Sequence, residues 1–204
     1  MAGQHDGHLG AVYAARDTAQ VAAAYDAWAE TYEAEMRAAG YRHPSVGLAL
    51  LARHLPRGAG PILDAGAGTG LIGEWLAILG YRQIEALDLS AGMLEVAARK
   101  RVYARLTQAA LGGPLPFDDG SFAAIVSTGV FTTGHVGAEA LPELFRICRP
   151  GGVIVLTVKL TLWQGGIDAW LTANGVGRIE TTVPYLSMPG DAETTPSLAT
   201  VLRV

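Results

Sequence analysis

The chain shows two different patterns of apolar and polar positions, and they meet near residue 58. Before that point, residues 18–40 are rich in helix formers and place apolar or aromatic side chains at steps of three and four, which predicts one amphipathic helix. Residues 43–58 predict a second helix, with Pro44 tolerated in its first turn and Pro56 ending it. Beyond residue 58, short apolar runs alternate with helical stretches, a pattern typical of an α/β domain.

The alternation predicts the order of the strands. Strands are expected at 61–66, 83–90, 103–111, 122–129 and 153–160, with helices at 71–79, 91–101, 138–149 and 166–175. Two last extended runs, 178–188 and 198–204, have no helix between them and should pair antiparallel at one edge. The predicted fold is α/β, a Rossmann-like doubly wound sheet of seven strands, mostly parallel with an antiparallel edge strand and with helices on both faces.

Three segments are expected along the chain: residues 1–15 as a flexible N-terminal tail, 16–57 as a helical cap, and 58–204 as the α/β core. Composition agrees with one compact domain, since half of the 204 residues are hydrophobic and 17% are charged. A formal net charge of −4 without a basic stripe argues against a nucleic-acid partner.

Cysteine content and the apolar runs bear on the compartment. Cys148 is the single cysteine, which excludes an internal disulfide and a thiol metal framework; it falls in a predicted helix and should be buried and inert. The first residues lack the pattern of a secretory signal, and no apolar run reaches the ~20 residues of a membrane span. We therefore expect a cytoplasmic protein with no membrane span and no metal site.

A glycine loop carries the main chemical signal. Residues 62–70 read ILDAGAGTG and lie between a predicted strand and a helix, the context of a nucleotide-binding loop. The spacing is G-x-G-x-G, whereas dinucleotide-binding loops have G-x-G-x-x-G. Asp64 would repel a pyrophosphate and attract an ammonium, and Asp88 ends the next strand, where a carboxylate can accept hydrogen bonds from two ribose hydroxyls. The predicted guest is an adenosine with a cationic amino-acid tail.

The motifs resemble a known family. ILDAGAGTG and EALDLSAGML are similar to the first two signature motifs of the class I S-adenosylmethionine-dependent methyltransferases, and LPFDDGSF and LPELFRICRPGGVIVLTVK resemble their later landmarks. The resemblance extends from about Tyr25 to the C-terminus and is greatest to the small-molecule branch called type 11. It implies S-adenosyl-L-methionine as cofactor, a small-molecule methyl acceptor, and a monomer or homodimer.

The resemblance also implies a set of cofactor-binding residues. The glycine loop would surround the methionine portion and ribose, Asp64 would act through the loop and water on the ammonium, and Asp88 would bind the ribose. The full set is Tyr25, Tyr32, Asp64, Ala65, Gly66, Ala67, Gly68, Gly70, Asp88, Leu89, Met93, Leu111, Gly112, Ser127 and Thr128. The sequence departs from the family pattern in two places, and both concern the residues assigned to the adenine. AALGGPLPF lacks the acid that many relatives carry before LPF, and Phe122-Ala123 stands where many have Phe-Asp.

Several alternatives stay open. Tyr25, Trp28 and Tyr32 form an aromatic stripe that either packs in the core or covers the cationic end of the cofactor. His135 follows the fourth strand and is a candidate general base. The rivals to small-molecule methyl transfer are a non-catalytic S-adenosylmethionine-binding or regulatory module, a protein or RNA methyltransferase, and a nicotinamide-dependent dehydrogenase.

Overall fold

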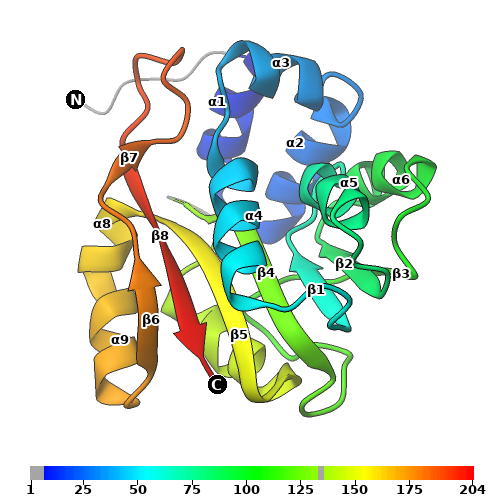
Figure 1. Ribbon diagram of the computed structural model, residues 1–204. Coiled ribbons are helices and arrows are strands. Elements are labelled where there is room, and N and C mark those ends of the chain that lie inside the picture. Colours follow the sequence, from blue (N-terminus) through cyan, green and yellow to red (C-terminus); the bar gives the residue numbers. More distant parts are fainter. Residues whose placement is uncertain (1–6, 133–135) are drawn as a thin grey trace.

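A computed structural model describes residues 7–132 and 136–204 (Figure 1). Its centre is one sheet whose strands follow the order β3-β2-β1-β4-β5-β8-β6, with the short β7 paired beside β8. The strands are β1 (Ile62–Ala65), β2 (Ile84–Asp88), β3 (Arg105–Gln108), β4 (Phe122–Phe131), β5 (Cys148–Lys159), β6 (Gly177–Thr181), β7 (Tyr185–Leu186) and β8 (Pro196–Arg203).

The strand directions confirm the predicted topology. Strands β1 to β5 run parallel, whereas β8 pairs antiparallel with both β5 and β6. The antiparallel strand thus lies one place inside the edge, which β6 forms, and β7 adds a short strand to the seven expected.

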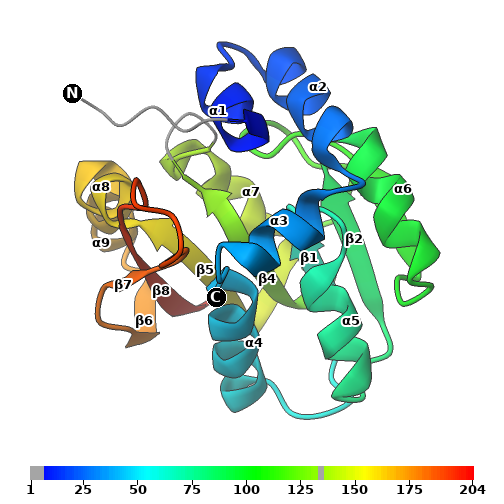
Figure 2. The same ribbon diagram turned by 90° about the horizontal axis from the view of Figure 1, so that it is seen from above.

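Helices cover both faces of the sheet (Figure 2). Helices α4 and α5 pack on one face, and α7 and α9 on the other. The helices are α1 (Gly7–Ala14), α2 (Thr18–Trp28), α3 (Tyr32–Ala38), α4 (His43–His54), α5 (Leu71–Ile78), α6 (Ala91–Arg99), α7 (Leu141–Ile147), α8 (Leu160–Leu162) and α9 (Asp168–Ala173), with short turns η1 (Ala138–Ala140) and η2 (Trp163–Ile167).

The alternation of side chains along each strand explains the two cores. Ile62 and Val126 face α4 and α5, while their neighbours Leu63 and Ile125 face α7. Because both faces are covered, β1 is buried at every position and reads as a continuous apolar run broken only by Asp64. The carboxyl ends of β1, β2 and β4 then meet at one edge of the sheet, where ligands of such folds bind.

The N-terminal segment differs from the prediction in two places. Residues 7–14, expected to lie in a flexible tail, form helix α1, because Val12 is buried in a cluster with Trp28 and Met36. The single helix predicted over 18–40 is two helices, α2 and α3. At the turn between them, Glu35 accepts hydrogen bonds from the Trp28 indole and the Thr31 hydroxyl, at 2.9 and 2.6 Å. The turn lets Trp28 and Met36 enter one cluster.

Cys148 also differs from the prediction. It is the first residue of β5 instead of part of a helix, since α7 ends at Ile147 and β5 begins with a register shift between Phe122 and Ala124 of β4. Burial raises the pKa of the Cys148 thiol to about 11, which is consistent with the expected inert side chain. Within the described ranges, no helix has the length and apolar character needed to cross a membrane.

Candidate functional site

The glycine loop between β1 and α5 folds over the end of β2. Gly66, Gly68 and Gly70 all have positive φ angles, of 79°, 54° and 83°, a region that residues with a Cβ rarely adopt. The amide of Gly66 donates to the carbonyl of Leu87 at 2.7 Å, and the amide of Gly68 donates to Oδ2 of Asp88 at the same distance. The three glycines therefore allow the backbone conformation that brings the loop into contact with Asp88, the last residue of β2.

Asp88 is held by two backbone amides. Besides Gly68, the amide of Ser90 donates to Oδ1 at 2.9 Å. A carboxylate offers about four acceptor positions, so two hydrogen bonds leave capacity for two more donors. Burial raises the pKa of Asp88, while the hydrogen bonds from the Ser90 and Gly68 amides act in the opposite direction. The arrangement suits a vicinal pair of hydroxyl groups.

Asp64 occupies a different environment. It is 1% exposed, and its Oδ2 accepts a hydrogen bond of 2.5 Å from the hydroxyl of Tyr103. Its Oδ1 is buried without a hydrogen-bond partner among the described residues. Burial raises the pKa of Asp64 to about 7, although the Tyr103 hydrogen bond lowers it. Asp64 therefore lies under the loop, away from open space.

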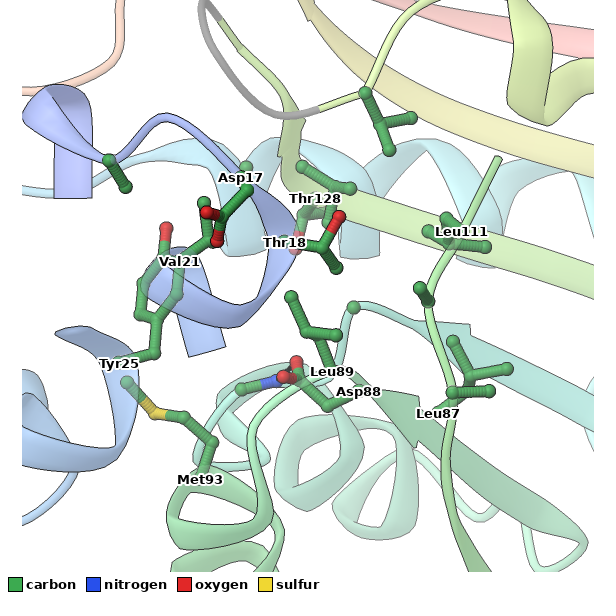
Figure 3. A pocket seen from close by; sticks show the side chains of 18 of the residues that line it. Asp17, Thr18, Val21, Tyr25, Leu87, Asp88, Leu89, Met93, Leu111 and Thr128 are labelled. Atoms are coloured by element: carbon green, nitrogen blue, oxygen red, sulfur yellow. Dashed lines mark hydrogen bonds between the residues drawn. The ribbon is translucent and has the colours of Figure 1, made fainter. Parts of the chain in front are cut away.

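A cavity of about 430 Å³ opens where the loop, the strand ends and the N-terminal helices meet. In Figure 3, Asp88 and Leu89 lie on one side of it, and Asp17, Val21 and Tyr25 of the N-terminal segment lie on the other. The lining residues are Ala15, Arg16, Asp17, Thr18, Val21, Tyr25, Tyr32, Gly66, Gly68, Leu87, Asp88, Leu89, Met93, Ala109, Ala110, Leu111, Thr128, Gly129, Val130 and Val136.

Most of the residues expected in the site meet at this cavity. Those in its lining are Tyr25, Tyr32, Gly66, Gly68, Asp88, Leu89, Met93, Leu111 and Thr128. Those outside its described lining are Asp64, Ala65, Ala67, Gly70, Gly112 and Ser127. Ser127 and Ala65, two of the residues outside the lining, are buried and bonded to each other: the Ser127 hydroxyl donates to the Ala65 carbonyl at 2.7 Å. Gly70 instead packs against the ring of Tyr103. His135 lies outside the described residues.

Several lining residues escaped the sequence-based prediction. Arg16 and Thr18 stand at the start of α2, and Gly129 and Val130 extend β4 past the residues considered. Arg16 is the cationic side chain of the described lining. Asp17 was expected to cap α2, and its side chain does accept the Gln20 amide at 2.8 Å. The sequence did show a positive and a negative residue, Arg16 and Asp17, side by side at the start of α2. Nothing in the neighbouring sequence showed that this helix start faces the strand ends.

Helix α2 is tied to the segment that follows β2 through Asp26. Its Oδ1 accepts the hydroxyl of Ser90 at 2.5 Å and the amide of Gly92 at 2.8 Å. The Ser90 hydroxyl in turn accepts the amide of Met93 at 3.0 Å, so it caps α6 as predicted. The start of α6 is thus capped from its own chain segment and from α2, next to Asp88.

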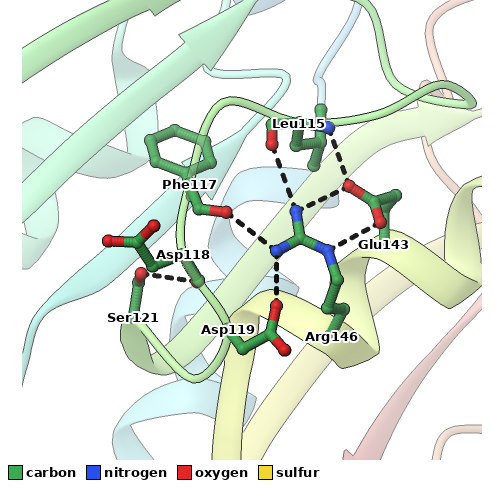
Figure 4. A network of polar contacts seen from close by, with 7 residues as sticks. All are labelled: Leu115, Phe117, Asp118, Asp119, Ser121, Glu143 and Arg146. Carbon is green, nitrogen blue, oxygen red and sulfur yellow. Dashed lines mark hydrogen bonds and ion pairs between the residues drawn. The ribbon is translucent and has the colours of Figure 1, made fainter.

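The guanidinium of Arg146 holds the segment between β3 and β4, which forms another wall of the cavity. Between β3 and β4 the described chain has no helix, and Ala109, Ala110 and Leu111 of this segment line the cavity. Figure 4 shows Arg146 of α7 reaching into the segment, where it donates to the carbonyls of two residues and pairs with two carboxylates. These partners are Leu115, Phe117, Asp119 and Glu143.

The aromatic stripe takes part in both the core and the cavity. Trp28 is 2% exposed and stacks on Tyr25 with ring centroids 6.1 Å apart, while Tyr32 meets it edge-on at 4.9 Å. Tyr25 and Tyr32 also line the cavity, but Trp28 does not appear in its described lining. Trp28 therefore packs in the core, and contact of Tyr25 or Tyr32 with the cofactor stays a prediction.

Comparisons with known proteins agree with this fold. Residues 63–156 match the family described as a methyltransferase domain. Human methyltransferase-like protein 27 is 38% identical over 149 residues, which cover 70% of this chain and 59% of the human protein. A malonyl-[acyl-carrier protein] O-methyltransferase of Yersinia pestis is 33% identical over 179 residues, 82% of this chain and 61% of that protein. The chain thus spans about three-fifths of the length of these relatives.

Solved structures share the fold. A TehB-like S-adenosylmethionine-dependent methyltransferase of Corynebacterium glutamicum superimposes with a TM-score of 0.67 at 23% identity, over 89% of this chain and 98% of that one. The [4+2]-cyclase SpnF superimposes with a TM-score of 0.69 at 17% identity, over 93% and 96%. Residues 63–156 thus form a methyltransferase domain, and the fold is that of S-adenosylmethionine-dependent methyltransferases. S-adenosyl-L-methionine is the cofactor of this family.

Proposed function

We propose that the chain transfers a methyl group from S-adenosyl-L-methionine to a small-molecule acceptor. The observation that carries this proposal is the cavity in which the Gly66–Gly68 turn and the Asp88 carboxylate face the same space. A Cβ built on Gly68 would meet no atom within 4 Å, so the loop leaves room for a guest at that point. When bound, the cofactor supplies an activated methyl group on its sulfonium.

The lining offers a partner for each part of the cofactor. Asp88 has free acceptor positions for the ribose hydroxyls, and Leu89, Met93 and Leu111 offer apolar contacts for the adenine. Arg16 lines the same cavity and is our candidate partner for the amino-acid carboxylate. With these groups held, the remaining task of the chain is to align an acceptor and exclude water.

Three features favour a small acceptor. The relatives include enzymes named for malonyl-[acyl-carrier protein] and for demethylmenaquinone. The net charge of −4 and the lack of a basic stripe speak against an RNA acceptor. The G-x-G-x-G spacing speaks against a nicotinamide dinucleotide. Because SpnF shares the fold under the name of a cyclase, methyl transfer needs a direct test.

Calorimetric titration with S-adenosylmethionine, S-adenosylhomocysteine and NAD in parallel tests the cofactor. We expect both adenosyl ligands to bind; binding of NAD alone would overturn the proposal. Asp88→Asn should weaken both adenosyl ligands at least tenfold, because a hydrogen bond to a charged group contributes about 1.5–3 kcal/mol. Transfer itself is tested by incubating the protein with methyl-labelled cofactor and fractionated metabolite extracts, where label should move to a small molecule.

A further inference from the structure

A second, smaller cavity of about 40 Å³ adjoins the first. The two share Tyr25, Tyr32 and Gly129 in their linings, so a molecule in the second cavity would lie beside the guest of the first. The Tyr41 hydroxyl of the second lining packs directly on Gly129, since a Cβ on Gly129 would lie 1.9 Å from it. The second cavity is therefore in position to hold part of a methyl acceptor.

Lys159, the last residue of β5, lines the second cavity and is only 5% exposed. Its ammonium donates one hydrogen bond, of 3.0 Å, to the carbonyl of Thr195. Within the described ranges no carboxylate forms an ion pair with it. Burial lowers the pKa of Lys159, and the charge of Asp191 only partly offsets this. A buried ammonium with three donors and one neutral acceptor lacks the counter-ion that such groups usually have.

His43 does not supply that counter-ion and does not compete with Lys159 as a cation. It is 2% exposed, and its Nδ1 shares a hydrogen bond of 2.8 Å with the hydroxyl of Tyr185. Burial, followed by the charge of Lys159, lowers the pKa of His43 to about 3. The ring is therefore neutral at physiological pH, and Lys159 is the charged group of the described lining.

The other walls are neutral. Its tyrosines are Tyr13, Tyr25, Tyr32 and Tyr41, and burial raises the pKa of each of them, so they remain protonated and carry no negative charge. The apolar walls come from Leu9, Trp28, Met36 and Met188. One cation, neutral walls and the absence of a carboxylate in the described lining form an environment that favours an anion.

Building on the methyl-transfer function proposed above, we propose that this cavity is the acceptor subsite and that the acceptor is a small organic acid whose carboxylate binds Lys159. The volume of about 40 Å³ suits a carboxylate group and not a whole metabolite, so the rest of the acceptor extends past Gly129 toward the cofactor.

The chain offers a direct spectroscopic test because it contains two lysines, Lys100 and Lys159. Protein labelled with ¹³C-lysine and saturated with S-adenosylhomocysteine should give two side-chain signals. Lys100 already pairs with Glu33 and Glu74, at 2.9 and 2.8 Å, and serves as an internal control. Propionate and benzoate are titrated as probes, each against its neutral isostere, propionamide or benzamide.

At least one carboxylate should shift the Lys159 signal saturably, with the matching amide binding at least tenfold more weakly and Lys100 unmoved. No saturable shift with either carboxylate, or equal shifts with acid and amide, would overturn the proposal. A failure of the proposed cofactor is seen separately, since S-adenosylhomocysteine would then not bind before any acid is added.

The Lys159→Met variant assigns the Lys159 signal. It also distinguishes two possible partners of the Lys159 ammonium, the carboxylate of the acceptor and the carboxylate of the cofactor. The variant should lose the carboxylate response while keeping its affinity for S-adenosylhomocysteine within about twofold. If its affinity for S-adenosylhomocysteine instead falls tenfold, Lys159 pairs with the amino-acid carboxylate of the cofactor and the acceptor proposal is wrong. Should the variant not fold, the acid and amide titrations of the unchanged protein still decide the question.

Discussion

The hydroxyl of Tyr103 donates a 2.5 Å hydrogen bond to Oδ2 of Asp64, directly before the glycine loop. The same ring packs against Gly70 and Gly73, where Cβ atoms would approach it to 2.9 and 2.1 Å. One side chain thus contacts the carboxylate before the loop, the glycine that ends the loop, and the first turn of α5. The position of the loop depends on this tyrosine, and two predictions follow from its contacts.

Asp64 should make stability fall as pH rises. Its pKa is raised to about 7, so between its ordinary value near 4 and pH 7 the folded protein holds a proton that the unfolded chain has released. The free energy of unfolding should therefore decrease across this range and level off above it. Asp64→Asn should remove a decrease on the order of 2 kcal/mol between pH 5 and pH 8.

Urea unfolding of both proteins at the two pH values measures this effect. Asp118→Asn, which changes an exposed carboxylate, is the matched control and should keep the decrease seen in the unchanged protein. A decrease of equal size in Asp64→Asn would show that other groups cause it.

Gly73→Ala should destabilise the protein although alanine favours helices. The new Cβ would lie 2.1 Å from the Tyr103 hydroxyl and force the ring away from Asp64, at a cost of about 1–3 kcal/mol. Gly165→Ala is the control, because a Cβ there meets nothing within 4 Å. Thermal unfolding compares them; equal melting temperatures would contradict the proposed crowding.

Arg16 should act on the amino-acid tail of the cofactor and not on its adenosine. Because the side chain is exposed, Arg16→Ala should weaken S-adenosylhomocysteine by roughly fivefold. It should leave 5′-methylthioadenosine, which has no amino-acid tail, unchanged. Calorimetry with both ligands measures the difference; an equal loss for the two would place Arg16 elsewhere.

Arg146 should determine the order of the segment between β3 and β4. Arg146→Gln should raise amide exchange over residues 109–121, because it removes the hydrogen bonds to the Leu115 and Phe117 carbonyls. The Arg146 guanidinium lowers the pKa of Glu143 to about 2, so this pairing holds above the ordinary carboxyl pKa and is lost as pH falls toward 2. Arg149→Gln removes another arginine, an exposed one, and should leave amide exchange over residues 109–121 unchanged.

The alternation of strands and helices was predictable because each element has a local cause. Apolar runs ending in Asp64 and Asp88 marked β1 and β2, and Ser90 marked the start of α6. The break between α2 and α3 had no such mark, since residues 29–31 include neither glycine nor proline. It arises from the joint burial of Trp28 and Met36, a tertiary effect that helix propensity does not contain.

The candidate site likewise contains residues that motifs predicted and residues that only the tertiary structure revealed. Gly66, Gly68 and Asp88 meet at the cavity because motif spacing and parallel topology bring strand ends together. Arg16 and Lys159 are brought to their cavities by the packing of segments far apart in the sequence. Asp64 belongs to the motif but lies in β1, and its burial against Tyr103 could not be seen without the position of residue 103.

The cap that Asp26 places on α6 has a consequence for shortened versions of the chain. Removing residues 7–40 would uncover the cavity, and it would also take away the acceptor that holds the Ser90 hydroxyl and the Gly92 amide. The α/β core would then keep every strand, and yet the first turn of α6, next to Asp88, would lose the cap that Asp26 supplies. Helix α2 therefore supplies a cap that the α/β core does not provide for itself.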